Sequence, residues 1–366
     1  MRIGVDAREL AGKTTGVGRY LWRLLTEWGA MRDAARHEFV LYLPVRPDAA
    51  LDSTVAALRA TVAVVPGTAG TWWEQVQLPA AARRDGLDVF FAPAYTAPLL
   101  LSCPTVVTVH DLSYMAHPEW FPIREGWRRR LVTRAVVRRA RAVLTDSAFS
   151  QSEVMRLTRA PAERVHVIYL GAGIGGPPPD VDRREPVVLF VGSMFNRRRI
   201  PDLVHAFARL AAHDPAVRLD IVGEDRTWPA QHVSALVEDL GLDSRVTLHS
   251  WVDDEALRAL YQRASVFAFL SEYEGFGLTP LEALAYGVPI VVLDTAVARE
   301  IYGDAAAYVA PGDLDATAAA LAEMIAGGPA RQQQLSAAVG TLARYSWRDA
   351  AVRTLAVLTS VGRCDP

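Results

Sequence analysis

Short apolar runs alternate with longer helix-forming stretches along the whole chain, which is the pattern of parallel α/β proteins. The runs that predict strands in the first half are Arg2–Asp6, Glu38–Leu43, Asp88–Phe91, Thr105–Val109, Ala142–Thr145 and Arg164–Ile168. Those in the second half are Val187–Val191, Arg218–Val222, Arg245–Leu248, Ala264–Leu270 and Val288–Leu293. The last helices are predicted over about 316–326 and 347–361.

One central stretch interrupts this alternation. Residues 171–180 are rich in glycine and proline, which is typical of an interdomain linker. We therefore predict an amino-terminal domain over 1–172, a linker over 173–186 and a second domain over 187–345. The segment 346–366 is a candidate to cross back to the first domain. Two Rossmann-like halves predict a cleft between them, where ligands of α/β sheets tend to bind.

The composition restricts the class of protein. With 366 residues, 51% of them hydrophobic and 22% charged, the chain can form two ordinary globular cores. A formal net charge of -2 predicts no nucleic-acid partner. Cys103 and Cys364 form neither a disulfide framework nor a zinc-ligand cluster, which fits a reducing cytosol. Early charges at the amino terminus and the lack of a run of about 18 apolar residues predict neither a signal peptide nor a transmembrane helix.

Two carboxylates form the most informative motif. Glu274 and Glu282 have seven residues between them and follow the buried strand predicted at 264–270. Thr279 is a candidate helix N-cap, Pro280 suits the first helical position, and Glu282 would complete a capping box. A glycine-bearing loop before a helix N-terminus is an anion site, and carboxylates beside it suit sugar hydroxyls. Alternatively, Glu282 only caps the helix and Glu274 is an ordinary loop residue.

The string Glu-Gly-Phe-Gly-Leu-x-Pro-Leu-Glu-Ala-Leu-Ala-x-Gly-x-Pro, from Glu274 to Pro289, closely resembles the Glu-x7-Glu motif of retaining glycosyltransferases of family 4. That family has the GT-B fold, and the resemblance extends from the Gly16 loop to Trp347, with a general likeness to the bacterial mannosyltransferases of the family. It implies transfer of a hexose, with mannose favoured, from a UDP- or GDP-sugar to a glycan or lipid-linked acceptor in cell-surface polysaccharide assembly. It implies retention of configuration, no metal or other cofactor, and a cytoplasmic enzyme, with a peripheral place at the inner membrane face left open.

The resemblance also implies roles for the residues of this motif. Glu274 would accept hydrogen bonds from sugar hydroxyls, and Glu282 from the ribose. The backbone amides between them would hold the phosphate and the sugar, and Val252 would lie near the base. These amides belong to Gly275, Phe276, Gly277 and Leu278.

Three consecutive arginines, Arg197 to Arg199, follow the first strand of the second half. They are a candidate diphosphate clamp or, equally, a solvated basic turn. Members of the family usually carry Arg-Lys-Asn here, so Arg197 matches the pattern, whereas Arg198 replaces lysine and Arg199 replaces asparagine. We assign donor binding to Arg197 and Arg198.

A glycine-bearing turn follows the first strand. Gly16 and Gly18 would allow close backbone approach before a helix that begins near Arg19. The turn does not complete a dinucleotide fingerprint, which argues against nicotinamide binding. The resemblance implies that this loop faces the donor diphosphate and the transferred sugar.

His110 and Asp111 end a strand in the first half, and such strand ends face the ligand crevice of α/β sheets. A lone histidine is more often structural, but the resemblance places a histidine here beside the reacting sugar and the acceptor. We therefore predict that His110 is catalytic. The aromatic residues within 118–122 fit an acceptor pocket or a core equally well.

The segment 127–141 is a strongly basic helix candidate. Its apolar positions form one face: Leu131, Val132, Ala135, Val136 and Ala140. A surface helix packed on the sheet is the simpler interpretation, and docking to anionic lipid head groups is the alternative.

Asp313 and Asp315 imitate a metal motif but precede a helix, where Asp caps are expected. No other cluster has metal-ligand spacing, so we predict no metal site.

Other functions remain to be distinguished. A nucleotide-sugar epimerase of similar architecture would convert the donor without an acceptor, and a non-catalytic binding protein would release no nucleotide. A glycan phosphorylase is nearly excluded, because it needs a lysine for pyridoxal phosphate and Lys13, in the first glycine loop, is the only lysine.

Overall fold

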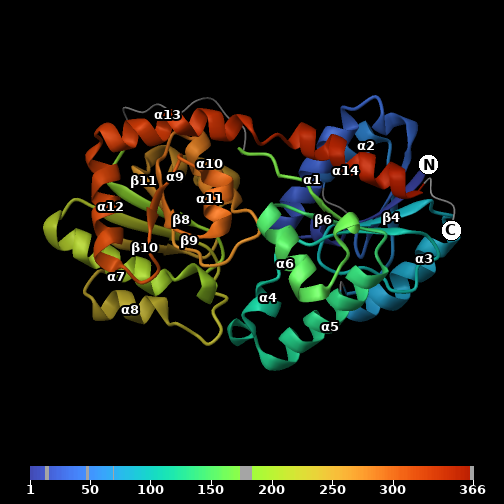
Figure 1. Cartoon of the computed structure of the whole chain (residues 1–366), viewed down its shortest axis with the longest axis horizontal. Coiled ribbons are helices and arrows are strands. Elements are labelled where there is room, and N and C mark those ends of the chain that lie inside the picture. The colour runs from blue at the N-terminus through green and yellow to red at the C-terminus, as the bar shows by residue number, and fades with distance from the viewer. Residues whose placement is uncertain (13–15, 47–48, 69, 174–183, 363–366) are drawn as a thin grey trace. The chain divides into compact units, whose positions relative to one another are not determined.

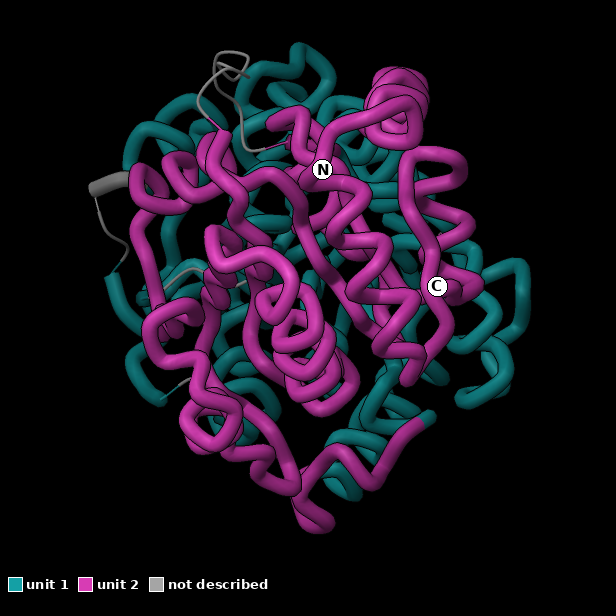
Figure 2. Tube along the Cα trace, turned by 90° about the vertical axis from the view of Figure 1, so that its left-hand side faces the viewer, with its two compact units in different colours: residues 1–116, 126–171, 346–366 teal, residues 117–125, 172–345 magenta. Residues whose placement is uncertain are grey.

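The computed structural model describes residues 1–12, 16–46, 49–68, 70–173 and 184–362. It divides into two compact units (Figure 2). Unit 1 contains 1–116, 126–171 and 346–366, and unit 2 contains 117–125 and 172–345. Most of the predicted linker lies outside the described residues, as do Lys13 and Cys364. The grouping assigns 117–125 to unit 2 although these residues lie within the first half of the chain.

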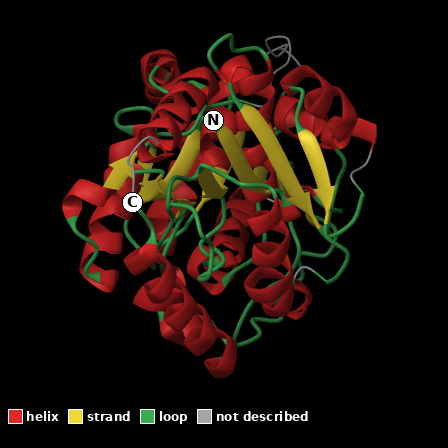
Figure 3. Cartoon of the chain, turned by 90° about the vertical axis from the view of Figure 1, so that its right-hand side faces the viewer, coloured by secondary structure: helices red, strands yellow, loops and turns green. Residues whose placement is uncertain are grey.

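Unit 1 is built on a seven-stranded parallel sheet in the order β3-β2-β1-β4-β5-β6-β7, with helices packed around the strands (Figure 3). Its strands are β1 (Arg2–Asp6), β2 (Glu38–Leu43), β3 (Thr61–Val64), β4 (Val89–Ala92), β5 (Thr105–Thr108), β6 (Ala142–Thr145) and β7 (Val165–Val167). Its helices are α1 (Gly16–Gly29), α2 (Ala49–Leu58), α3 (Leu78–Arg84), α4 (Ser113–Ala116), α5 (Ile123–Arg139), α6 (Ala148–Thr158) and α14 (Trp347–Gly362). The start of α5, up to Glu125, is grouped with unit 2.

Unit 2 is built on a six-stranded parallel sheet in the order β10-β9-β8-β11-β12-β13 (Figure 1). Its strands are β8 (Val187–Val191), β9 (Arg218–Val222), β10 (Val246–His249), β11 (Val266–Phe269), β12 (Ile290–Leu293) and β13 (Ala307–Val309). Its helices are α7 (Ile200–His213), α8 (Val233–Asp239), α9 (Asp254–Arg263), α10 (Leu278–Ala285), α11 (Ala296–Tyr302), α12 (Leu314–Ala326) and α13 (Pro329–Ala343).

The central strands are apolar and buried along their whole length, because helices cover both faces of a parallel sheet. Every residue of β4, β8 and β12 is buried. This is why these strands are visible in the sequence as continuous apolar runs. The two Rossmann-like α/β folds that the sequence predicted are confirmed.

Two edge strands were missed. All four residues of β3 are at least partly exposed, and β13 has three residues, of which two are partly exposed. An edge strand needs less apolar surface than a central strand, so its sequence signal is weaker.

The last helix, α14, packs within unit 1. The indole of Trp28 donates a hydrogen bond of 2.9 Å from Nε1 to the carbonyl of Ala351, and Arg353 donates one of 2.7 Å to the carbonyl of Val167. A Cβ on Gly171 would lie 2.3 Å from the ring of Trp347. The absence of a side chain at Gly171 therefore permits the close approach of α14.

Candidate functional site

In unit 2, the order of the strands creates a switch point between β8 and β11, where the chain winds outward in opposite directions. Loops that leave the carboxyl ends of two such strands diverge and leave room for a ligand. The loop after β8 carries the three arginines, and the loop after β11 carries Ser271 and Glu274. The topology thus brings together two motifs that are more than 70 residues apart, as the hydrogen bond between Arg198 and Glu274 shows.

The carboxylate of Glu274 is fixed by donors from both loops. Ser271 donates a hydrogen bond of 2.9 Å from Oγ, and Arg198 donates one of 3.0 Å from Nε, to the same oxygen. Nε of Arg197 lies 3.6 Å from that oxygen, and the Glu274 side chain is 13% exposed. Charge-assisted donors of this kind fix the carboxylate as a hydrogen-bond acceptor.

Arg198 lies on a backbone surface that only glycine can provide. Its Nη1 donates a hydrogen bond of 2.8 Å to the carbonyl of Ser193. Gly192 has φ +142°, and a Cβ there would lie 2.3 Å from this nitrogen. In the adjacent strand loop, a Cβ on Gly223 would lie 2.0 Å from the carbonyl oxygen of Gly192. The two glycines therefore set the position of the guanidinium.

Arg199 has a different environment from its two neighbours. Its side chain forms ion pairs with Asp202 and Glu272. Burial lowers the pKa of Arg199, but the hydrogen bonds and charges of these two partners outweigh it, so the net pKa is raised. Its backbone is left-handed, with φ +48°. Asparagine tolerates this conformation better than other non-glycine residues, which gives a backbone reason for the asparagine usual in the family. At this position the two ion pairs support the arginine.

The helix after Glu274 begins two residues earlier than the cap prediction requires. Gly277, with φ +86°, is the N-cap of α10, and Thr279 lies in the first turn, so the predicted Thr279 cap is wrong. The hydroxyl of Tyr302 donates a hydrogen bond of 2.9 Å to the carbonyl of Gly277. A Cβ on Gly277 would lie 2.0 Å from that hydroxyl oxygen. Tertiary packing against Tyr302, together with the positive φ, therefore sets the start of the helix.

Glu282 lies in the second turn of α10, so the capping box predicted with Thr279 is also wrong. Its residue is 7% exposed, and its Oε2 accepts a hydrogen bond of 3.1 Å from the hydroxyl of Tyr261. The ring of Tyr261 stacks on that of Tyr286 at 5.3 Å. Glu282 is thus a buried acceptor supported by aromatic packing.

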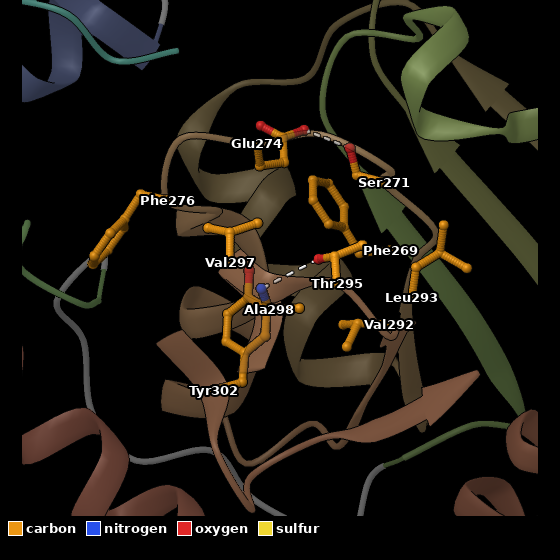
Figure 4. Close-up of a pocket in the computed structure, with 10 residues that line it drawn as sticks. All are labelled: Phe269, Ser271, Glu274, Phe276, Val292, Leu293, Thr295, Val297, Ala298 and Tyr302. Atoms are coloured by element: carbon orange, nitrogen blue, oxygen red, sulfur yellow. Dashed lines mark hydrogen bonds between the residues drawn. The ribbon is translucent and has the colours of Figure 1, made fainter. Parts of the chain in front are cut away.

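A pocket lies beside Glu274 in unit 2. Figure 4 shows Ser271, Glu274 and Phe269 at the end of β11, and Thr295 and Tyr302 at the two ends of α11. The hydroxyl of Thr295 caps α11 by accepting a hydrogen bond from the amide of Ala298. Burial, and then the nearby Glu274 charge, raise the pKa of Tyr302 well above its ordinary value. At neutral pH Tyr302 is therefore a neutral hydrogen-bond donor at this wall.

In unit 1, His110 is held between groups from three adjacent strands. It follows β5, while Pro93 follows β4 and Asp146 follows β6. Its Nδ1 lies 2.7 Å from Oδ2 of Asp146, and its Nε2 lies 2.8 Å from the carbonyl oxygen of Pro93. The ring of Tyr20 meets it edge-on at 4.9 Å. The orientation of the imidazole is thus fixed from both sides.

These contacts determine the protonation of the His110–Asp146 pair. A carbonyl oxygen only accepts, so Nε2 must carry a proton. A second proton must lie between Nδ1 and the carboxylate, because two lone pairs at 2.7 Å would repel each other. Burial lowers the pKa of His110, but Asp146 and the Pro93 carbonyl outweigh it, and the net pKa is raised. Burial also raises the pKa of Asp146, so the pair holds two protons, and the raised pKa of His110 favours an imidazolium beside the carboxylate.

Tyr95, beside His110, has a left-handed backbone with φ +48°. Its ring meets the imidazole at 5.5 Å, and its hydroxyl points to Oδ2 of Asp111 at 3.4 Å. Its amide donates a hydrogen bond of 2.8 Å to the carbonyl of Thr108. Such conformations cost about 1–3 kcal/mol and concentrate at functional sites. Neither Tyr95 nor Asp146 was identified from the sequence, although Asp146 follows the apolar run 142–145 directly, a position that is itself a signal.

The aromatic residues within 118–122 were predicted to line a pocket or a core. Trp120 is half-buried and stacks on His117 at 4.0 Å, with 13° between the ring planes. His117 meets Tyr273 edge-on at 5.6 Å, and Tyr273 directly precedes Glu274. His117 therefore contacts the residue that precedes Glu274, and Trp120 stacks on His117. The segment 117–125 is grouped with unit 2.

The remaining predicted residues have the following places. Gly16 begins α1, and Gly18 lies in its first turn. These glycines therefore belong to the helix and not to a loop before Arg19. The residues 13–15 that precede them lie outside the described residues. Val252 is half-buried between β10 and α9. Asp313 caps α12 through the amide of Ala316 at 2.9 Å, as predicted.

Within the described ranges, no group of three or more His, Cys, Asp or Glu residues is arranged to hold a metal ion. In the same part of the chain, no helix combines the length and the apolar character needed to cross a bilayer.

Two family models match successive parts of the chain. The description "Glycosyltransferase Family 4" covers residues 14–175, and "Glycosyl transferases group 1" covers residues 178–339. Among curated relatives, the O-antigen chain mannosyltransferase B of Escherichia coli is 28% identical over 75% of this chain and 75% of its own length. The MMP alpha-(1->4)-mannosyltransferase of Mycolicibacterium hassiacum is 29% identical over 69% of this chain and 64% of its own length.

Solved structures show the same fold. A sucrose-phosphate synthase from Thermosynechococcus elongatus has a TM-score of 0.74 at 20% identity and covers 98% of both chains. Anabaena Alr3699/HepE in complex with UDP and glucose also has a TM-score of 0.74 at 20% identity, covering 98% of this chain and 100% of that one. WaaG, a glycosyltransferase involved in lipopolysaccharide biosynthesis, has a TM-score of 0.74 at 17% identity and covers 98% of this chain and 100% of its own. The chain therefore belongs to the glycosyltransferases of the GT-B fold, with a first half that matches family 4 and a second half that matches group 1.

Proposed function

We propose that this glycosyltransferase moves a hexose from a UDP- or GDP-sugar to a glycan or lipid-linked acceptor, with retention of the anomeric configuration and without a metal. The observation that carries the proposal is the convergence of Ser271 and Arg198 on Glu274 at the switch point of the second sheet. A fixed carboxylate suits sugar hydroxyls. The mannosyltransferases among the relatives support mannose and cell-surface polysaccharide assembly.

In this proposal the second unit binds the donor. Arg197 and Arg198 neutralise the diphosphate, and the amides of residues 275–278 add the positive end of the α10 dipole. Glu274 accepts hydrogen bonds from the sugar. Glu282 accepts them from the ribose, and Val252 contacts the base through its backbone. The structures of HepE with UDP and with UDP-glucose are consistent with a UDP donor, and the mannosyltransferase relatives are consistent with GDP-mannose.

The first unit would supply His110. Because both of its ring nitrogens face acceptors, the imidazole has no lone pair with which to take a proton. Both ring nitrogens are already used within unit 1, so we assign His110 to electrostatic stabilisation and to holding the strand ends that position the sugar and the acceptor, and not to general base catalysis. The acceptor hydroxyl attacks the anomeric carbon from the leaving-group side as the bond to the diphosphate breaks. The leaving phosphate oxygen takes both the electron pair and the acceptor proton. Gly16 and Gly18, at the start of α1, would lie on the donor side of this step.

A thermal-shift screen tests donor binding directly. UDP, GDP, ADP and their hexose conjugates are added one at a time, with and without EDTA. A rise of a few degrees with one nucleotide alone identifies the base, because a ligand that binds only the folded state stabilises it. Loss of that rise in EDTA would contradict the metal-free site. No rise with any nucleotide would remove the support for donor binding.

Kinetics of alanine variants test the assigned roles. Glu282→Ala should raise KM for the donor with little change in kcat, while Glu274→Ala and His110→Ala should also lower kcat. Unchanged turnover for both would contradict the assignment. NMR of the product fixes the anomeric configuration. It also separates a transferase from an epimerase, which converts donor with no acceptor, and from a binding protein, which releases no nucleotide.

A further inference from the structure

Helix α5 presents a row of apolar side chains to solvent. Ile123, Trp127 and Leu131 are 84%, 62% and 47% exposed. Residues four positions apart lie on one face of a helix, so the three side chains form a continuous exposed row. Leu131 belongs to the apolar face identified from the sequence, whose Val136 is buried and whose Leu131 is exposed. The buried residues of α5 are Gly126, Thr133, Val136 and Val137.

The same helix is strongly basic, although the chain as a whole is slightly acidic. Of its 17 residues, seven are arginines and Glu125 is the one acid. Six of the seven arginines are exposed, and the other is half-buried. The exposed ones are Arg124, Arg128, Arg129, Arg134, Arg138 and Arg139. The helix therefore has apolar residues on two sides. One set is buried, and the other forms an exposed row surrounded by cations.

A neighbouring segment adds to this surface. Nη1 of Arg128 donates a hydrogen bond to Oγ1 of Thr71. The next residue, Trp72, is 70% exposed. Within unit 1, Figure 1 shows α5 at the periphery, and the hydrogen bond brings the Thr71 segment to its flank. Two exposed tryptophans thus occur near one basic helix.

We propose that α5 docks on an anionic lipid surface, with Ile123, Trp127 and Leu131 entering the boundary between head groups and acyl chains. Arginines around an apolar row with a central tryptophan are the composition of interfacial helices. A nucleic acid would explain the arginines but not the apolar row. Symmetric self-association through this face would bring two sets of arginines together and is disfavoured by their repulsion.

Co-sedimentation with vesicles tests this docking, without donor or acceptor, so that its outcome is independent of the proposed transferase function. The protein should sediment with vesicles that contain phosphatidylglycerol and much less with pure phosphatidylcholine. Combined Ile123→Ser, Trp127→Ser and Leu131→Ser should weaken binding at least about tenfold, since three apolar side chains leave the bilayer. Val339→Ser, on α13 and 72% exposed, is the matched control and should change nothing.

A second pair of variants isolates the charge. Each arginine near an anionic surface contributes roughly fivefold in affinity, so Arg134→Gln with Arg138→Gln should weaken binding roughly 25-fold at low salt. Arg32→Gln with Arg36→Gln, both exposed elsewhere in unit 1, should have little effect. Equal binding of the serine variant and the native protein would overturn the proposal. So would a native protein that ignores lipid but dimerises, or binds an RNA probe, through this helix.

Discussion

Replacing Asp146 with asparagine changes the protonation of His110 while keeping the shape of the side chain. In the native protein, Nδ1 of His110 shares a proton with Asp146 at 2.7 Å, and Nε2 donates to the Pro93 carbonyl at 2.8 Å. The asparagine amide can donate to Nδ1, so the variant can hold a neutral imidazole with its proton on Nε2. Loss of the charge-assisted hydrogen bond should cost about 1.5–3 kcal/mol of unfolding free energy.

The cost should depend on pH, and its sign follows from the raised pKa of His110. A histidine whose folded pKa lies above its unfolded value contributes stability that is fully present below about pH 6.5. That contribution is lost as the pH rises through the folded pKa. Above it, native Asp146 is a buried carboxylate without a cationic partner, and asparagine should then be neutral or stabilising.

Urea unfolding at a series of pH values from about 6 upward measures this difference between the native protein and Asp146→Asn. The destabilisation should be largest at the lowest pH and shrink as the pH rises. Histidine NMR gives a second measurement: the His110 resonance, assigned by its absence in His110→Gln, should titrate at lower pH in the variant. A destabilisation that is the same at all pH values, or an unchanged titration, would refute the protonation argument.

Three further predictions concern unit 2. Gly277→Ala should lower the unfolding free energy by roughly 2–4 kcal/mol, because the backbone has φ +86° and the new Cβ would lie 2.0 Å from the Tyr302 hydroxyl oxygen. In urea titrations, adding Tyr302→Phe to this variant should restore part of the lost free energy. Gly223→Ala should cost roughly 3 kcal/mol, since its Cβ would meet a backbone oxygen at 2.0 Å, and an unchanged midpoint in urea would contradict this packing. Arg198→Ala should lower kcat about 10²–10³-fold, as removal of one donor to a developing charge does. Arg199→Ala, whose native side chain pairs with Asp202 and Glu272, is the control and should retain most activity in the same nucleotide-release assay.

Much of the fold could be read from the chain. The strands Arg2–Asp6, Glu38–Leu43, Val187–Val191 and Arg218–Val222 were predicted to the residue, because buried parallel strands are continuous apolar runs. The Asp313 cap was also correct, since a cap depends on residues within one turn. Errors occurred where distant contacts intervene. Thr279 looked like a cap, but packing of Tyr302 on Gly277 starts the helix earlier.

The candidate site divides in the same way. Glu274, Glu282 and the arginines were visible because each lies in a short local motif after a strand. The direction of each side chain was not visible. Arg198 turns to Glu274 whereas Arg199 turns to Asp202, and no local rule distinguishes two adjacent arginines. Asp146, the partner of His110, comes from another strand altogether.

By itself, then, the sequence determined the α/β class, the central strands of the two sheets and the polar residues that follow those strands. It could do so because burial and helix capping act over a few neighbouring positions. Only the tertiary structure decided which strand ends are adjacent. The order of β4, β5 and β6 places Pro93 and Asp146 on either side of His110, and these contacts raise the pKa of the imidazole. It also decided which face of α5 is buried, since that depends on the elements packed against the helix, such as α4, whose Tyr114 forms a hydrogen bond with Thr133, and not on the helix's own pattern of apolar residues.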